Sequence, residues 1–137
     1  MGEAVVQVAR MLCATVIGTT SGDALERAKE LGVDRVYDFT LIDLADRTDL
    51  HGTFDVVFDT SGALPVKTAM RLLSKADVFL DINATPTKFV HSALIRRHEI
   101  YFCTPTTKIL TEVAATAVDG HLRASVGDTV PSRTPSA

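Results

Sequence analysis

The sequence feature that most constrains the fold is the stretch from Thr53 to Gly62. Residues 56–58 form an apolar run of branched and aromatic side chains between turn-forming residues. This pattern predicts a strand that is buried on both faces inside a parallel sheet. Ligands of open α/β sheets bind at the carboxyl ends of the strands. The small polar residues that follow the strand are therefore candidate binding residues: Asp59, Thr60, Ser61 and Gly62.

Strand and helix patterns alternate along most of the chain. We expect strands at 15–18, 35–38, 56–58, 78–82 and 100–103, and helices at 3–12, 24–31, 65–73, 87–97 and 110–118, with a helical turn within 40–52. Asp23 is expected as a helix N-cap, Pro65 as a helix start, and Gly32 as the residue that ends a helix. This alternation predicts an α/β doubly wound, mostly parallel sheet.

The chain has 137 residues and a hydrophobic content of 46 %, enough for one domain with a core. Its composition changes beyond Leu122 to Ser, Thr, Pro and Gly. We therefore expect one domain at 1–123 and a disordered tail at 124–137, because the tail has little apolar surface to offset its ordering entropy.

Several classes of function are disfavoured by composition. The net charge is −3 and basic residues are scattered, whereas a nucleic-acid binder usually carries a basic face. The two cysteines and four histidines stand singly, so no zinc site is expected. Apolar runs are too short for a transmembrane helix. We expect a cytoplasmic protein that binds neither nucleic acid nor membrane.

Three stretches, taken together, resemble the cofactor domain of the medium-chain dehydrogenase/reductase family. This family includes zinc alcohol dehydrogenases, quinone oxidoreductases and enoyl reductases. Residues 2–10 resemble the helix after its glycine-rich turn, 14–32 its second strand and helix, and 54–62 its fourth strand. The likeness runs from about residue 2 to 123 and implies a Rossmann-like dinucleotide-binding domain.

The same resemblance implies that the usual first strand is missing. Gly2 falls on the last glycine of the family's fingerprint, with no strand before it. That strand is central in the usual order of the sheet. We expect the strands near residues 15 and 56 either to pair directly or to leave a gap, and a gap would invite association with another chain.

The resemblance also implies a cofactor. A Rossmann domain that binds NAD usually has Asp or Glu at the end of the second strand. This chain has Thr19, Thr20 and Ser21 there, which favours NADP(H) over NAD(H), although a plain Ser/Thr turn is the alternative. The predicted cofactor-binding residues are Gly2, Thr19, Thr20, Ser21, Asp59, Thr60, Ser61, Gly62, Asn83 and Ala84.

The resemblance implies quinone-reductase-like or enoyl-reductase-like hydride transfer, but the sequence offers no catalytic constellation. We expect weak or no turnover from this chain alone, and a separate substrate domain as a possible partner. One alternative is a non-catalytic remnant that forms a homodimer through the strand Ile100–Cys103. A methyltransferase-like domain is a further alternative, because Phe-Asp-Val-Val-Phe-Asp at 54–59 also suits that class.

Overall fold

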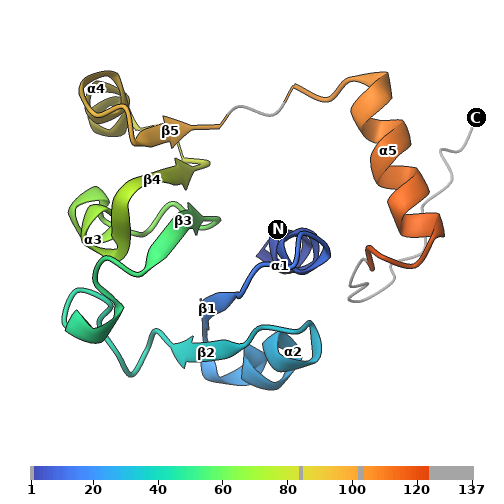
Figure 1. Ribbon diagram of the computed structural model, residues 1–137, viewed down its shortest axis with the longest axis horizontal. Helices are drawn as coiled ribbons and strands as arrows, with labels where there is room; N and C mark the ends of the chain where they lie inside the picture. Colours follow the sequence, from blue (N-terminus) through green and yellow to red (C-terminus); the bar gives the residue numbers. More distant parts are fainter. Residues whose placement is uncertain (1, 84, 102–103, 124–137) are drawn as a thin grey trace, which may run out of the picture.

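The computed structural model describes residues 2–83, 85–101 and 104–123 of the chain. Helices and strands alternate along it, which confirms the predicted α/β architecture (Figure 1). The helices are α1 (Gly2–Met11), α2 (Leu25–Glu30), α3 (Val66–Leu72), α4 (Pro86–Leu94) and α5 (Thr107–Val118), and the strands are β1 (Ile17–Thr20), β2 (Arg35–Asp38), β3 (Phe54–Asp59), β4 (Leu73–Asp81) and β5 (His98–Ile100). Short 3-10 turns lie at Gly22–Ala24 and Thr48–Leu50.

The described strands pair only in parallel and form two separate groups. β1 pairs with β2, while β3, β4 and β5 pair in that order. No pairing joins β1 to β3 among the described residues. Of the two outcomes expected for a sheet without its first strand, the structure therefore has the gap.

The hydrophobic core lies on one side of this gap. It is built from buried side chains of β3, α3 and β4 and of the segment before β3: Leu50, Val57, Ala69, Leu72, Leu73 and Phe79. The half-buried side chains of Tyr37 and Leu44 pack against it. Among the described residues, the only buried hydrophobic side chain outside this cluster is Val33.

The elements on the other side of the gap are poorly covered. Neither α1 nor β1 contains a buried residue. Val8 is 47 % exposed although it belongs to the apolar stripe of α1, and Leu12, directly after this helix, is 77 % exposed. An amphipathic helix normally covers its apolar stripe with a sheet, so α1 lacks part of the surface on which it would pack.

Several predicted boundaries were wrong. β1 lies two residues later than expected, and β5 ends at Ile100 rather than Cys103, which is outside the described residues. Asp23 is not an N-cap but lies inside a 3-10 turn. Pro65 is the N-cap of α3 rather than its first helical residue. β4 starts directly after α3, five residues before the predicted strand.

The predicted end of α2 was more accurate, whereas α4 ends at Leu94, three residues before the predicted end at 97. Gly32 and Gly120 have φ angles of +89° and +75°, the left-handed conformation that lets a helix stop at glycine. After α5 the chain returns to α1, where the side chain of Gln7 bonds both backbone groups of Arg123, at 3.0 and 2.7 Å. The proposed tail at 124–137 lies outside the described residues.

Candidate functional site

Three of the strands end in an aspartate that holds the loop after it. Asp38 accepts hydrogen bonds from the N–H and hydroxyl of Thr40 at the end of β2. At the end of β4, Asp81 accepts from the N–H of Asn83 at 2.8 Å. A carboxylate two residues before a backbone N–H closes an Asx turn. These turns fix the loops at the carboxyl edge, where an open α/β sheet binds ligands.

Asp59 at the end of β3 holds its loop most extensively. Its carboxylate accepts from the N–H groups of Ser61, Gly62 and Leu64 at 2.8–3.0 Å, and from the Ser61 hydroxyl. Burial acts to raise the pKa of Asp59, but these hydrogen bonds favour its charged form and together lower that pKa. The carboxylate of Asp59 is therefore engaged in hydrogen bonds to the loop that follows it.

The loop after β3 packs closely against the end of β4. A Cβ added to Gly62, whose φ is +75°, would lie 2.3 Å from the Cβ of Asn83. Only glycine fits this position, because both the backbone conformation and the space exclude a side chain. The structure thus brings two predicted cofactor residues, Gly62 and Asn83, into contact.

The amino end of α1 lies at the same edge. A Cβ built on Gly2 would be 3.5 Å from the hydroxyl oxygen of Thr60. Glu3, in the first turn of α1, pairs with Arg27 of α2 at 2.5 Å. This hydrogen bond and the Glu3 charge raise the pKa of Arg27. The first turn of α1 therefore lies between the loop after β3 and the helix after β1.

The hydroxyl residues at the end of β1 lie across the gap from this group. Thr19 and Ser21 are exposed and Thr20 is half-buried. Ser21 precedes a 3-10 turn without capping it through its side chain. Arg27 is the basic residue nearest to them in the sequence after this turn, and it is paired with Glu3. Ala84, the last predicted cofactor residue, is outside the described residues.

Lys88 on α4 is a site residue that sequence reasoning missed. Its Nζ lies 2.5 Å from Oδ2 of Asp81 and donates to the carbonyl oxygen of Gly62 at 3.0 Å. The Asp81 side chain is fully buried and that of Lys88 is 12 % exposed. The lysine thus ties α4 to both loops. The signal for it was Asp81 itself, because a carboxylate at the end of a buried strand needs a partner.

His98 at the start of β5 was also missed, since a single histidine carries no motif. Its ring stacks on Phe79, with ring centroids 4.8 Å apart, and Nε2 lies 3.7 Å from Oδ2 of Asp81. Within the described residues neither ring nitrogen has a hydrogen-bond partner. Burial lowers the pKa of His98, with help from Lys88 and His91 and against the opposing charge of Asp81. The ring therefore fits its site best when neutral.

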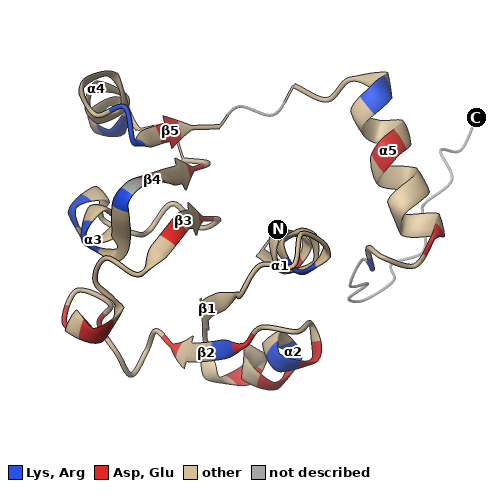
Figure 2. Ribbon diagram, viewed as in Figure 1, with Lys and Arg blue, Asp and Glu red and all other residues tan. Residues whose placement is uncertain are grey.

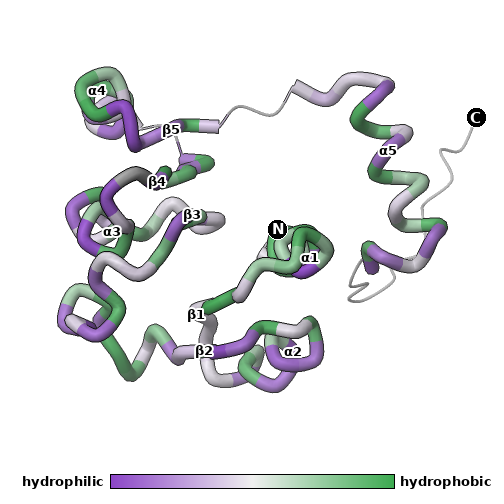
Figure 3. The backbone as a smooth tube through the Cα atoms, viewed as in Figure 1, coloured by the Kyte–Doolittle hydropathy of each residue, from purple (hydrophilic) through white to green (hydrophobic). Residues whose placement is uncertain are grey.

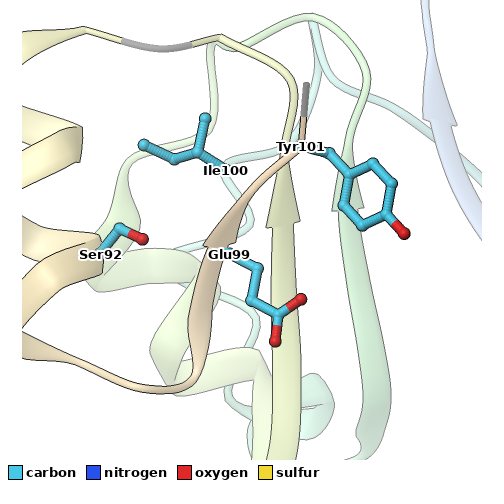
Figure 4. A pocket seen from close by; sticks show the side chains of 4 residues that line it. All are labelled: Ser92, Glu99, Ile100 and Tyr101. Carbon is cyan, nitrogen blue, oxygen red and sulfur yellow. The ribbon is translucent and has the colours of Figure 1, made fainter. Parts of the chain in front are cut away.

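A shallow hollow of about 560 Å³ lies outside this group of residues (Figure 4). It is lined by Ser92 of α4 and by Glu99, Ile100 and Tyr101 of and after β5. No predicted cofactor residue takes part in it. Figure 2 shows lysine and arginine spread over many elements rather than gathered on one face.

Among the described residues, no group of three or more His, Cys, Asp or Glu side chains could hold a metal ion. The described helices include none that is long and apolar enough to cross a bilayer.

Several solved structures share this fold. The chain is 17 % identical to Escherichia coli quinone oxidoreductase complexed with NADPH, with a TM-score of 0.63 over 92 % of this chain and 44 % of that one. AibC is 24 % identical, with a TM-score of 0.65 over 93 % and 41 %. The CurK enoyl reductase is 19 % identical, with a TM-score of 0.65 over 91 % and 42 %.

The likeness covers only part of each solved structure. The chain spans less than half the length of each of these three structures, and no curated protein matches it. At such identities the likeness shows the fold alone. The family is shown by a separate match, because the model for zinc-binding dehydrogenases matches residues 1–98. The chain therefore belongs to the zinc-binding dehydrogenase family, as a Rossmann-like cofactor-binding domain of the medium-chain dehydrogenase/reductase type.

Proposed function

We propose that this chain is the NADP(H)-binding part of a medium-chain oxidoreductase that transfers hydride to a quinone or an enoyl substrate. The observation that carries the proposal is the position of the amino end of α1 beside the carboxyl end of β3, where a Cβ built on Gly2 would lie 3.5 Å from the hydroxyl oxygen of Thr60. A helix amino terminus offers free N–H groups and partial positive charge, which suit a pyrophosphate.

The donor groups around this terminus fit a dinucleotide. The charge of Glu3, which would repel a phosphate, is neutralised by Arg27 at 2.5 Å. Thr60 offers a hydroxyl group on one side, and Thr19 and Ser21 do so on the other, whereas the Ser61 hydroxyl donates to Asp59 and positions the loop. We propose that these residues, with Gly2, Thr20, Gly62 and Asn83, hold the cofactor. When bound, it supplies the hydride.

The chain's own role in this reaction is to bind and to orient. Asp59 and Lys88 fix the backbone of the loop that carries Thr60 to Gly62. Both charges are engaged within the protein, and neither points to an acid–base step. A substrate domain would complete the reaction, so residues 1–137 alone should turn over weakly or not at all.

The preference for NADP(H) rests on the end of β1. No carboxylate stands among Thr19, Thr20 and Ser21 to bind the ribose hydroxyls of NAD. Support also comes from the quinone oxidoreductase above, which was solved with NADPH. The preference should be moderate, because Arg27 is paired with Glu3.

The test is a titration of the folded 137-residue chain with NADPH and with NADH, followed by nicotinamide fluorescence. We expect saturable binding, tighter for NADPH. Ser21→Asp should weaken NADPH binding and reverse the preference, because its carboxylate repels the 2′-phosphate. Thr104→Asp, an exposed site after β5, is the matched control. A chain that is folded by circular dichroism but binds neither nucleotide would contradict the proposal.

A second candidate is the non-catalytic homodimer, favoured by one observation. Among the described strands, β5 pairs only with β4, and Tyr101 beyond its end is 59 % exposed. An unpaired edge strand is a template for pairing with another chain. Nucleotide binding by a monomer would favour the first proposal, and dimerisation without nucleotide binding would favour the second.

A further inference from the structure

We propose that the buried carboxylate of Asp81 is a two-position switch, which binds Lys88 while His98 is neutral and binds His98 once that ring is protonated. In the second position Lys88 leaves the carbonyl group of Gly62, so the loop after β3 loses its link to α4. Acidification thus loosens a loop to which we assign part of the cofactor site. The switch itself rests on the contacts of these side chains, and only its effect on a nucleotide rests on the proposed function.

The first observation is that two side chains that can carry positive charge lie beside the same oxygen atom. Oδ2 of Asp81 is 2.5 Å from Nζ of Lys88 and 3.7 Å from Nε2 of His98. The second distance is too long for a hydrogen bond, so the ring lies beside this oxygen without using it. The other oxygen, Oδ1, accepts the N–H of Asn83 at 2.8 Å. The carboxylate therefore has one oxygen for two possible cations.

The second observation is that the ring of His98 has unused hydrogen-bonding groups in an apolar enclosure. Its side chain is fully buried and stacks on Phe79, its register partner on β4. Within the described residues, neither ring nitrogen has a hydrogen-bond partner. Figure 3 shows hydrophobic stretches in β4 and α4, the two elements that pack most closely on β5. A protonated ring has two N–H donors, and in these surroundings it requires an anion.

The charged groups that face this ring come from β4 and α4. Burial is the largest cause that lowers its pKa, the charge of Asp81 raises that pKa, and His91 and Lys88 lower it further. Arg97, the preceding residue, donates instead to backbone carbonyl oxygens of β4. Glu99, the next residue along β5, is exposed. Asp81 is therefore the anion available to the protonated ring, and the ammonium group of Lys88 competes for it.

Lys88 is the member of this group that can move. Its side chain is 12 % exposed, whereas those of Asp81 and His98 are fully enclosed. Two cations beside one carboxylate would leave a net positive charge in a site closed to water, which is strongly unfavourable. The flexible stem of a lysine can carry its ammonium group out to solvent, while the stacked ring stays in place. Protonation of His98 therefore expels Lys88.

The expulsion of Lys88 removes one contact that holds the loop after β3. Its Nζ donates to the carbonyl oxygen of Gly62 at 3.0 Å, and this hydrogen bond is lost when the lysine turns to solvent. Asp59 still accepts from three backbone N–H groups of the same loop, so the loop is loosened and not unfolded. Because Thr60 and Gly62 belong to the proposed cofactor site, nucleotide affinity should fall as the pH decreases.

The experiment follows the full 137-residue chain by NMR from about pH 7.5 to about pH 5. Three signals are recorded, and circular dichroism verifies the fold at each pH. The ring nitrogens of His98 report protonation, and the ε-methylene group of Lys88 reports its contact with Asp81. The amide nitrogen of Ala63 reports the carbonyl group of Gly62, which belongs to the same peptide unit. We expect all three signals to change with one common midpoint.

Two variants separate the members of the switch. His98→Phe keeps an aromatic ring on Phe79 but cannot be protonated, so the signals of Lys88 and Ala63 should stay constant over the same pH range. His121→Phe, at an exposed histidine, is the control and should retain both changes.

Lys88→Met removes the competing cation and leaves Asp81 to the ring alone. The proton affinity of His98 should therefore rise by at least about tenfold. Lys108→Met, at a side chain that is 85 % exposed, should leave that affinity unchanged. If Lys88→Met does not fold, the comparison of His98→Phe with the unaltered chain decides the question.

Four outcomes would overturn the switch. They are protonation of His98 without a change at Lys88 and Ala63, changes at Lys88 that persist in His98→Phe, a ring that stays neutral until the whole chain unfolds, and a chain that is unfolded at neutral pH. The nucleotide is tested separately, by repeating the NADPH titration at both ends of the pH range. A working switch in a chain that binds no NADPH at either pH would contradict the proposed function and leave the switch intact.

Discussion

The Nζ atom of Lys88 lies 2.5 Å from Oδ2 of Asp81, and this ion pair is almost completely enclosed. Because the lysine also donates to the carbonyl oxygen of Gly62, it joins α4, the end of β4 and the loop after β3. Removing one member of an enclosed pair leaves the other charge buried without compensation.

Lys88→Met should therefore destabilise the protein by about 3–5 kcal/mol, measured by urea unfolding. Lys108→Met is the control, because Lys108 is 85 % exposed and its partner Glu112 is 3.9 Å away; it should cost less than about 1 kcal/mol. The double variant Lys88→Met with Asp81→Asn should recover part of the loss. If its effect equals the sum of the two single effects, the pair does not act as a unit.

Gly62→Ala should destabilise the protein by more than about 2 kcal/mol, because the new methyl group meets Asn83 and the φ of +75° is unfavourable for alanine. The variant Gly52→Ala separates the cost of the positive φ from the cost of the contact with Asn83. Its φ is +68°, but nothing lies within 4 Å of an added Cβ, so Gly52→Ala should cost only about 1 kcal/mol. Equal losses at the two glycines would mean that the contact with Asn83 is unimportant. Adding Asn83→Gly should relieve part of the Gly62→Ala loss.

The pH dependence of stability should contain a contribution from His98. Its pKa in the folded protein is lowered from 6.5, first by burial and then by His91 and Lys88, against Asp81. Between the two pKa values the unfolded chain binds more protons, so stability is full above pH 6.5 and falls as the pH decreases below it. His98→Phe should flatten this slope. His121→Phe, at an exposed histidine, should leave it unchanged, and a slope unaltered in both variants would exclude His98.

Homodimerisation through β5 should be limited by Glu99. This residue is the middle of the three in β5 and is exposed. A two-fold pairing of β5 strands would bring two Glu99 carboxylates near each other, which is unfavourable. Glu99→Gln should therefore strengthen self-association in sedimentation velocity, whereas Glu112→Gln on α5 should have no effect. Identical behaviour of both variants and the unaltered chain would remove β5 as the dimer edge.

The fold was predictable where local patterns decide the structure. The apolar runs predicted β2 and β3, and Gly32, which follows an apolar stripe, predicted the end of α2. Boundaries failed where tertiary contacts decide. β4 begins at Leu73 because that residue enters the core directly after α3. Likewise, Asp23 does not cap α2, because a 3-10 turn precedes that helix.

The candidate site was predictable only in part. Strand ends could be recognised from small polar residues, which led to Thr60, Gly62 and Asn83. The residues around Asp81 could not be recognised in this way. Lys88 and His98 reach Asp81 from elements whose position depends on the whole sheet. Such contacts follow no regular separation between residues in the sequence. Whether the ten predicted residues bind a cofactor stays a prediction.

Two hydrogen bonds join Gln7 and Arg123, near the two ends of the described chain. They span 116 residues, and closing a loop of that length costs roughly 4 kcal/mol of chain entropy. Two exposed hydrogen bonds return only about 1 kcal/mol each. This contact must therefore form after the sheet has already brought the ends together. α5 should be the last helix to dock during folding and the first to detach, well before the core opens.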